Sequence, residues 1–178
     1  MSIIEEKYME FVSIDPTDEK GIEVLSSVAT DIVGEYYEPL LGSAQNEYML
    51  RMFQSVEAIR EQMAQGYTYW LCDIEGRHVG FVGVCMHGDV TYLSKLYLHK
   101  SERGKGYGRA MMRLVIDFAL SKGSNGVELN VNKHNPTITI YEKMGFRRIR
   151  SEKNDIGNGY YMDDYVYRYD IRQNANKE

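Results

Sequence analysis

Arg103-Gly104-Lys105-Gly106-Tyr107-Gly108 is the most informative segment of this chain, and we call it the glycine loop. It stands between an apolar strand pattern at residues 90–98 and an amphipathic helix pattern at residues 110–119. Alternating glycines let the backbone turn sharply and expose successive N–H groups. The helix that follows adds unpaired N-terminal N–H groups and a partial positive charge. The stretch therefore predicts an anion site suited to a pyrophosphate, with full charges added by Arg103, Lys105 and Arg109.

Two other phosphate motifs do not fit this loop. The Walker A pattern needs a glycine five residues before the Gly-Lys pair, where this chain has His99, and a Ser or Thr after the lysine, where it has Gly106. The dinucleotide fingerprint needs G-x-G-x-x-G at the first unit of a doubly wound fold, but here the spacing is G-x-G-x-G in mid-chain. A plain glycine turn that caps a helix stays open as an alternative from the glycines alone.

The regions around the loop predict an α/β protein. Helices are expected from Asp15-Pro16 onward, in two shorter stretches before Gly66, and at Pro136 to Met144. A helix between two strands makes those strands parallel, so the sheet should be mixed, mostly antiparallel and twisted, with about six or seven strands and flanking helices. The expected strands cover residues 67–74, 77–86, 90–98, 126–131, 146–150 and 160–171, with a hairpin turn at Glu75-Gly76.

Composition fits an ordinary globular protein. The 178 residues suit one domain, 1–178, with a flexible tail at 173–178, and 43% are hydrophobic. The net charge of −5 argues against a nucleic-acid partner. Cys72 and Cys85 lie in apolar segments and are expected to be reduced core thiols. The charged first residues do not read as a secretory signal, and no apolar run approaches the ~20 residues of a membrane span, so we expect a cytoplasmic protein without a membrane partner.

The loop and its flanks resemble the Gcn5-related N-acetyltransferase (GNAT) family. Arg103 to Gly108 matches the family's motif A, [Q/R]-x-x-G-x-[G/A], at every defined position. Leu96-Tyr97-Leu98 looks like the end of the family's fourth strand. Asn135 and the run Tyr141-Glu142-Lys143-Met144-Gly145-Phe146 look like motif B. The resemblance covers residues 90–148, and the spacing from Asn135 to Tyr141 is one residue shorter than is usual.

The resemblance implies a GNAT-like single acyl-CoA N-acyltransferase domain with a V-shaped splay between strands four and five. Acetyl-CoA would be the co-substrate, and the implied cofactor-binding residues are Leu96, Tyr97, Leu98, Arg103, Gly104, Lys105, Gly106, Tyr107, Gly108, Arg109 and Asn135. Backbone groups near Leu96 and Leu98 would bind the pantetheine arm, and an N–H near Leu96 would polarise the thioester carbonyl. Asn132 and His134 are alternatives that would share the role of Asn135. Tyr141 would be the catalytic acid that protonates the leaving thiolate, since a phenol is protonated at neutral pH.

The general base is not identified by the sequence. Tyr92 and Glu128 lie on strands near the implied cleft, and Asp31, Glu35 and Glu38 lie on or after the first helix, where the family builds its acceptor site. Asp163-Asp164 is a further candidate, although each carboxylate can equally be a solvated surface group. The four histidines show no ligand spacing, so we expect no metal.

The resemblance thus implies an acetyl-CoA-dependent N-acetyltransferase that moves acetyl directly to a primary amine in a ternary complex. The acceptor is a small amine, such as a polyamine, or a protein amine, and a homodimer is a possible assembly. Transfer of another acyl group, such as succinyl, is an alternative. It would need basic residues around the acyl pocket, and Lys95 is the one that the strand-four segment offers. A non-catalytic, coenzyme A-binding sensor or scaffold domain is a second alternative.

Overall fold

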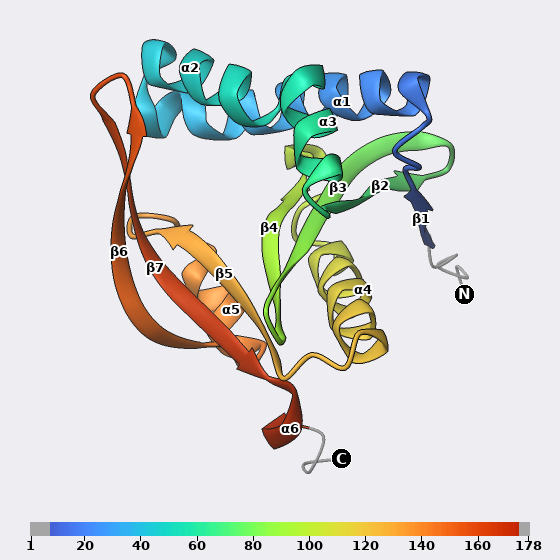
Figure 1. Cartoon of the computed structure of the whole chain (residues 1–178), viewed down its shortest axis with the longest axis vertical. Coiled ribbons are helices and arrows are strands. Elements are labelled where there is room, and N and C mark those ends of the chain that lie inside the picture. Colours follow the sequence, from blue (N-terminus) through green and yellow to red (C-terminus); the bar gives the residue numbers. More distant parts are fainter. Residues whose placement is uncertain (1–7, 175–178) are drawn as a thin grey trace, which may run out of the picture. The chain divides into compact units, whose positions relative to one another are not determined.

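A computed structural model describes residues 8–174 of the chain (Figure 1). One sheet has seven strands in the order β1-β2-β3-β4-β5-β7-β6. In chain order the elements are β1 (Met9–Ser13), α1 (Glu19–Leu41), α2 (Ser43–Phe53), α3 (Val56–Ala64), β2 (Thr68–Ile74), β3 (Arg77–His87), β4 (Val90–Leu98), the 3₁₀ helix η1 (Lys100–Glu102), α4 (Tyr107–Ser121), β5 (Gly126–Asn132), α5 (Ile138–Lys143), β6 (Arg147–Gly157), β7 (Tyr160–Asp170) and α6 (Ile171–Asn174). The predicted α/β class and mixed sheet are therefore confirmed.

The parallel junction falls where the strand–loop–helix–strand order predicted it. β4 pairs with β5 in parallel, from Val90 opposite Gly126 to Leu93 opposite Leu129. Both strands continue past the last of these pairs, β4 to Leu98 and β5 to Asn132. The pairs β1–β2, β5–β7 and β6–β7 are antiparallel.

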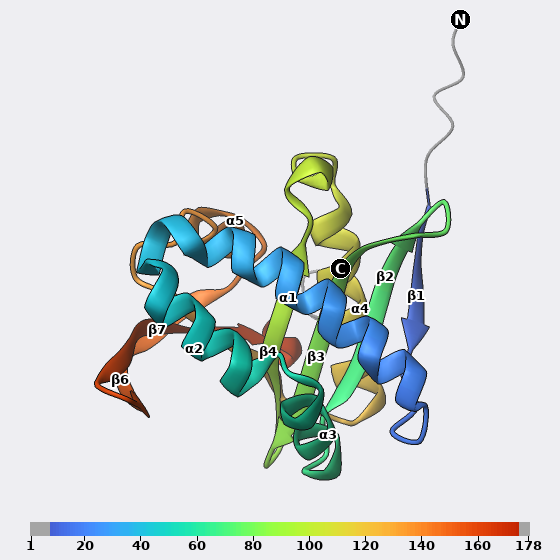
Figure 2. The same ribbon diagram turned by 90° about the horizontal axis from the view of Figure 1, so that it is seen from above.

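The chain divides into two compact units. The first comprises residues up to Gly83 together with Lys95–Met112, and the second comprises Val84–Ser94 together with the residues from Arg113 onward. In the first unit α1 runs across β2 and β3 (Figure 2). Its apolar stripe packs on α3 and on these strands in one core, formed by Ile14, Ile22, Leu25, Ala29, Val33, Ile59, Met63, Tyr69, Leu71 and Phe81.

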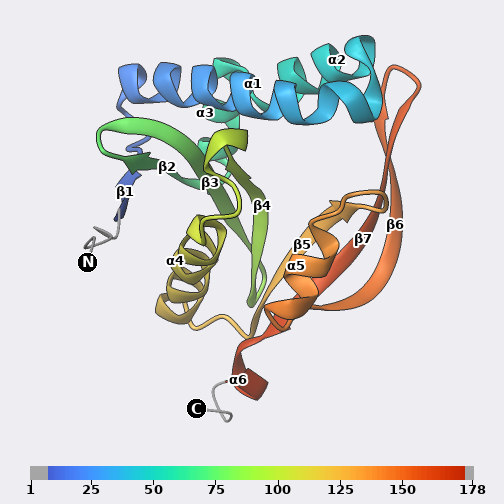
Figure 3. The same cartoon turned by 180° about the vertical axis from the view of Figure 1, so that it is seen from behind.

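In the second unit, β5 and β7 form the centre and α5 lies along them (Figure 3). Val127, Leu129 and Val131 alternate along β5 and are all buried, as their period of two predicts. The ring of Phe146, just after α5, is 3% exposed and lies 5.4 Å from that of Tyr169 on β7. Among residues 8–174 no helix is both long and apolar enough to cross a bilayer.

Several predicted boundaries were wrong. α1 begins at Glu19 and not at Asp15-Pro16. Oδ1 of Asp15 accepts a hydrogen bond from the N–H of Thr17 in a turn before the helix (2.8 Å). Asp18 is the N-cap, because its Oδ1 accepts from the N–H of Gly21 (2.9 Å). α5 covers Ile138–Lys143, shorter than the predicted 136–144.

Strands also differ at the ends of the chain. β1 was not predicted, and β6 extends beyond the expected 146–150 to Gly157. The final strand ends at Asp170, and residues 173–174 of the predicted tail belong to α6. Residues 175–178 lie outside the described part of the chain.

Candidate functional site

The glycine loop lies in the first unit, between η1 and α4. Gly104 and Gly106 adopt φ of 78° and 88°, the left-handed region that glycine enters without steric cost. Apart from the adjacent residues and the backbone of α4 itself, no atom of the described residues lies within 4 Å of the place where a Cβ would stand on Gly104, Gly106 or Gly108. Within residues 8–174, the amides of Gly104, Lys105 and Gly106 have no intramolecular acceptor. The loop therefore has room beside its glycines, and these three N–H groups are left without an acceptor in the described part of the protein.

The start of α4 adds to this arrangement. The helix runs for 15 residues from Tyr107, so its first N–H groups belong to the end of the glycine loop. These groups have no partner within a helix, and the helix macrodipole places a partial positive charge there. An anion with several oxygens can accept from the loop and from the helix start together.

The two basic side chains of the loop are engaged within the first unit. Arg103 Nε donates to the carbonyl oxygen of Leu98 (3.1 Å), and its guanidinium lies 5.0 Å from the centre of the Tyr36 ring. Lys105 pairs with the buried carboxylate of Glu102 (3.1 Å), which also contacts Arg77 (3.4 Å). The hydrogen bond from Lys105 lowers the pKa of Glu102. The backbone of the loop, more than its basic side chains, is thus oriented for an anion, while Arg109 stands exposed on α4.

The backbone N–H and carbonyl groups at the end of β4 point alternately to the two sides of the strand. The N–H of His99 donates to the carbonyl oxygen of Val79 on β3 (2.7 Å). Since backbone groups of successive strand residues point to opposite sides, those of Leu96 and Leu98 point away from β3. The pairs with β5 end at Leu93, before either residue. Leu96 and Leu98 therefore direct backbone groups to the side of β4 where an extended ligand could add as a strand.

An aromatic cluster joins this strand end to α1. The hydroxyls of Tyr37 and Tyr97 are 3.2 Å apart, and the Tyr97 ring is stacked with Phe81 at 5.5 Å. The guanidinium of Arg103 lies over the Tyr36 ring, whose centre is 6.4 Å from that of the Tyr97 ring. Tyr97 was predicted in the cofactor site, whereas Tyr36 and Tyr37 were not. Two adjacent tyrosines on a helix face were the available signal.

Asn135 and Tyr141 lie in the second unit. Oδ1 of Asn135 accepts from the N–H and the hydroxyl of Thr137 (2.9 and 2.7 Å), and Oδ1 of Asn132 accepts from the N–H of His134 (2.9 Å). These contacts shape the turn between β5 and α5. Tyr141 is half-buried on α5, with its ring 5.9 Å from that of Phe146. Which of Asn132, His134 and Asn135 contacts a cofactor stays a prediction.

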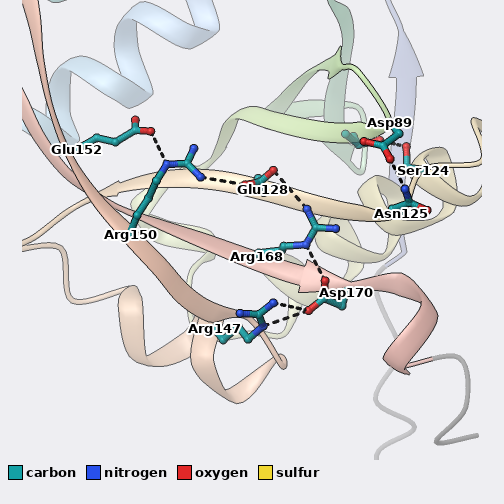
Figure 4. Close-up of polar contacts among 10 residues, drawn as sticks. Asp89, Ser124, Asn125, Glu128, Arg147, Arg150, Glu152, Arg168 and Asp170 are labelled. Carbon is teal, nitrogen blue, oxygen red and sulfur yellow. Dashed lines mark hydrogen bonds and ion pairs between the residues drawn. The ribbon is translucent and has the colours of Figure 1, made fainter.

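Most of the candidate bases are already engaged by other groups. Glu128 contacts Arg150 and Arg168, each at 3.5 Å, in the ion-paired face of β5, β6 and β7 (Figure 4). We use this name for Glu152, Arg150, Glu128, Arg168, Asp170 and Arg147. Hydrogen bonds from Ser43 and Asn46 lower the pKa of Glu38, and the hydrogen bond from Lys133 lowers that of Asp163.

Asp164 on β7 differs from these carboxylates. It is 3% exposed, and burial raises its pKa, which a hydrogen bond with Asn130 opposes. Asn130 on β5 links further groups, because its Oδ1 accepts from the Tyr92 hydroxyl (3.0 Å) and its Nδ2 donates to Glu152 (3.1 Å). The structure thus brings together Tyr92 and Asp164, both candidates from the sequence, through Asn130, which the sequence analysis did not single out.

Metal and thiol chemistry have little support in the described residues. No group of three or more His, Cys, Asp or Glu side chains in residues 8–174 is arranged to hold a metal ion. Burial raises the pKa of Cys72 to about 12, which disfavours the thiolate that a nucleophile needs.

Comparisons with known proteins agree with these features. The family model of the acetyltransferase (GNAT) domain matches residues 37–161. A probable N-acetyltransferase, camello, from Xenopus tropicalis is 30% identical over 94 residues, which make up 51% of this chain and 43% of that protein. An uncharacterized N-acetyltransferase of Escherichia coli, YjgM, is 28% identical over 47% of this chain and 53% of its own length. The chain thus spans about half or less of the length of these relatives.

Solved structures share the fold at low sequence identity. The PaiA N-acetyltransferase of Thermoplasma acidophilum, in complex with coenzyme A, superposes with a TM-score of 0.72 at 19% identity, over 92% of this chain and 99% of that one. A Gcn5-related N-acetyltransferase of Rhodopseudomonas palustris gives 0.74 at 12% identity, over 96% and 99%. GNAT acetyltransferases use acetyl-CoA as their co-substrate. The family model matches most of the length of this chain, and the solved structures share its fold. The chain therefore belongs to the GNAT acetyltransferase family.

Proposed function

We propose that this protein transfers the acetyl group of acetyl-CoA to a primary amine. The observation that carries the proposal is the glycine loop at the start of α4, where the N–H groups of Gly104, Lys105 and Gly106 have no acceptor within residues 8–174. A pyrophosphate matches this site because its oxygens accept several hydrogen bonds from a compact row of donors. The family match supports the choice of a coenzyme A thioester over other diphosphates.

The backbone of β4 would hold the acyl end of the co-substrate. Leu96 and Leu98 would bind the pantetheine amides, in the manner of an added strand. The N–H of Leu96 would donate to the thioester carbonyl oxygen, where negative charge develops as the amine attacks. Asn135 would add a contact from the turn before α5. Holding both reactants in line supplies much of the rate.

Two proton transfers complete the reaction. The attacking amine loses a proton and forms the C–N bond of the amide, while the C–S bond breaks and the sulfur leaves as a thiolate. Tyr141 would donate its hydroxyl proton to that sulfur. Asp164 would accept the amine proton, directly or through water, because its raised pKa suits a base better than the ion-paired Glu128 or Asp163. No covalent acyl-enzyme is required.

The acceptor would be a cationic amine, either a small molecule such as a polyamine or a protein amine. Asp164, which hydrogen-bonds with Asn130, supplies a carboxylate that such an amine prefers. We also propose a cytoplasmic location, where acetyl-CoA is available and cysteines stay reduced.

The test is thiol release from acetyl-CoA, with succinyl-CoA in parallel, across small amines, polyamines and peptides with free N-termini or lysines. We expect turnover with acetyl-CoA on at least one amine class, with the acetylated amine identified by mass spectrometry. Turnover with succinyl-CoA alone would move the proposal to another acyl group. Tight binding of coenzyme A without turnover on any amine would favour the sensor alternative.

A further inference from the structure

The side chain of Lys95 lies in the interior of the first unit. Lys95 precedes Leu96 on β4, and its side chain is buried, at 5% exposure. A buried ammonium usually pairs with a carboxylate, because an uncompensated charge is costly in a protein interior. Within residues 8–174 no carboxylate pairs with Lys95. Its surroundings must therefore compensate the charge in another way.

Three oxygen atoms surround its ammonium. Nζ donates to the carbonyl oxygen of Phe53 (2.5 Å), to Oε1 of Gln54 (2.9 Å) and to Oε1 of Gln62 (3.0 Å). We call these three oxygens the Lys95 cradle. Nζ also lies 5.2 Å from the centre of the Tyr69 ring, which favours a cation. The hydroxyl of Tyr69 donates to the same Oε1 of Gln62 (2.5 Å).

The number of donors matches the protonated form. A lysine ammonium has three N–H donors and no acceptor, which is one donor for each oxygen of the cradle. A neutral amine has two donors and a lone pair, so one oxygen of the cradle would then face a lone pair. Deprotonation of Lys95 would therefore remove one of the three hydrogen bonds of the cradle.

The cradle connects β4 to the helices. Phe53 ends α2, Gln54 lies in the turn before α3, and Gln62 belongs to α3. The turn is tied to α1 as well, because the hydroxyl of Ser26 donates to the carbonyl oxygen of Gln54 (2.7 Å). A single ammonium thus links β4 to the end of α2 and to α3, and through Gln54 to α1, one residue before Leu96.

We propose that Lys95 is a positioning residue for acetyl transfer, whose ammonium holds the backbone of Leu96 in register through the cradle and releases it on deprotonation. The inference rests on the proposed role of Leu96 as donor to the thioester oxygen. A misplacement of about 1 Å in such a group costs on the order of 100-fold in rate. The cradle also opposes the use of Lys95 as a recognition group for succinyl, because all three N–H donors are engaged inside the protein.

The titration of Lys95 supports this inference. Burial lowers its pKa to about 7. Among the groups that contact Nζ in the described residues, the phenol of Tyr69 is the one that can titrate, and the other contacts are a carbonyl and two amides. Loss of the ammonium is thus expected near neutral pH, and not at the alkaline pH of an exposed lysine.

Gln62→Glu tests the proposal without removing the lysine. A carboxylate at this position accepts from Lys95 and Tyr69 as the amide does, and an opposite charge within about 4 Å raises the pKa of a lysine by about one unit or more. The substitution also removes the hydrogen bond from Gln62 Nε2 to the carbonyl oxygen of Phe53 (3.2 Å), so the melting temperature is measured in parallel. Gln65→Glu, on the exposed end of the same helix segment, makes the same change of charge outside the cradle and is the control.

The readout is the amide resonance of Leu96 in nitrogen–proton NMR spectra across pH 5 to 10. We expect this resonance to titrate with a single midpoint, which Gln62→Glu moves to higher pH and Gln65→Glu leaves in place. A Leu96 amide that does not titrate, or a midpoint unchanged in Gln62→Glu, would overturn the proposal.

Lys95→Met adds a kinetic readout. Methionine keeps much of the apolar stem but has no donor, so we expect kcat/KM for the amine to fall about 30-fold, while the Kd for coenzyme A changes less than about threefold. Wild-type transfer rates in a folded Lys95→Met variant would overturn the proposal, and if this variant does not fold, the Gln62→Glu titration decides. Absence of amine acetylation in the wild type would instead contradict the proposed function, independently of the Leu96 titration.

Discussion

The glycine loop and the ion-paired face of the second unit are both rich in polar groups but use them in opposite ways. In the loop, the N–H groups of Gly104 to Gly106 have no acceptor among residues 8–174. On the ion-paired face, Arg168 lies between Glu128 and Asp170, and each of the six charged residues of this face contacts an opposite charge (Figure 4). The contrast separates polar groups that are available to a ligand from those that stabilise the sheet. It also explains why the backbone of the loop carries the functional proposal.

The largest effect is expected from Gly106→Asp. A carboxylate placed against a bound pyrophosphate brings like charges together at a cost of several kcal/mol, so the affinity for coenzyme A should fall about 1,000-fold. The matched control is Gly76→Asp in the β2–β3 turn, where φ is 76° and the space beside the glycine is equally open. Titration calorimetry should show a loss of affinity in the first variant only. Equal affinities in both would remove the loop from the site.

Tyr141→Phe tests the proton donor of the second unit. If the phenol protonates the thiolate, kcat should fall about 100-fold, with little change in the affinity for coenzyme A. Tyr161→Phe, which removes a hydroxyl from an exposed tyrosine of the same unit, is the control. Pre-steady-state thiol release separates chemistry from product release. An unchanged chemical step would show that water or another group supplies the proton.

Asp164→Asn tests the base through pH dependence. Burial raises the pKa of Asp164, so the rate in the wild type should fall as the pH drops through that raised value. The variant should not show this fall in rate at low pH, which we call the acid limb. Its kcat/KM should be about 100-fold lower than that of the wild type.

The raised pKa of Asp164 also predicts how the stability of Asp164→Asn differs from that of the wild type. With a raised folded pKa, ionised Asp164 costs free energy in the folded state, so the free energy of unfolding at pH 7 should not fall in Asp164→Asn. Asp163→Asn, at the neighbouring carboxylate paired with Lys133 (2.8 Å), should keep the acid limb. A retained acid limb in Asp164→Asn would assign the base elsewhere.

A smaller effect is expected from Gly108→Ala. No positive φ and no neighbouring atom oppose a methyl group here, and alanine favours a helix by about 0.5–1 kcal/mol over glycine. The protein should therefore melt no lower, while the methyl occupies space that the pyrophosphate needs and weakens coenzyme A about tenfold. Unchanged affinity would place the phosphates away from the helix start.

The smallest effect is expected on the ion-paired face. Arg168→Met removes one member of a partly exposed network and should lower the free energy of unfolding by about 1 kcal/mol, as measured in urea. Affinity for coenzyme A should stay within about twofold. A large loss of affinity would show that this face contributes to the cofactor site, and would end the contrast drawn above.

Features set by short-range pattern were predictable from the sequence. The Glu75-Gly76 turn, β4, the glycine loop and α4 each depend on neighbours a few residues apart, and all four lie where they were predicted. β1 and the end of β6 were missed because edge strands pair through their backbones, and polar stretches such as residues 151–155 give no apolar alternation.

Features that depend on distant contacts were not predictable. Lys95 meets Phe53, which lies 42 residues away, and Tyr92 meets Asn130 across 38. The spacing of residues in a local sequence pattern does not predict such pairs. Lys95 therefore read from the sequence as a basic residue of a strand, and Asn130 as an ordinary β5 position. Both acquire a role only through the neighbours that folding supplies.

The central claim, that the glycine loop binds a diphosphate through its backbone, is tested most directly by following amide resonances while coenzyme A is added. We predict that Gly104, Lys105, Gly106 and the first amides of α4 show the largest shifts, and that Gly106→Asp abolishes them. Binding of coenzyme A with these resonances unmoved, and the shifts elsewhere, would contradict the account.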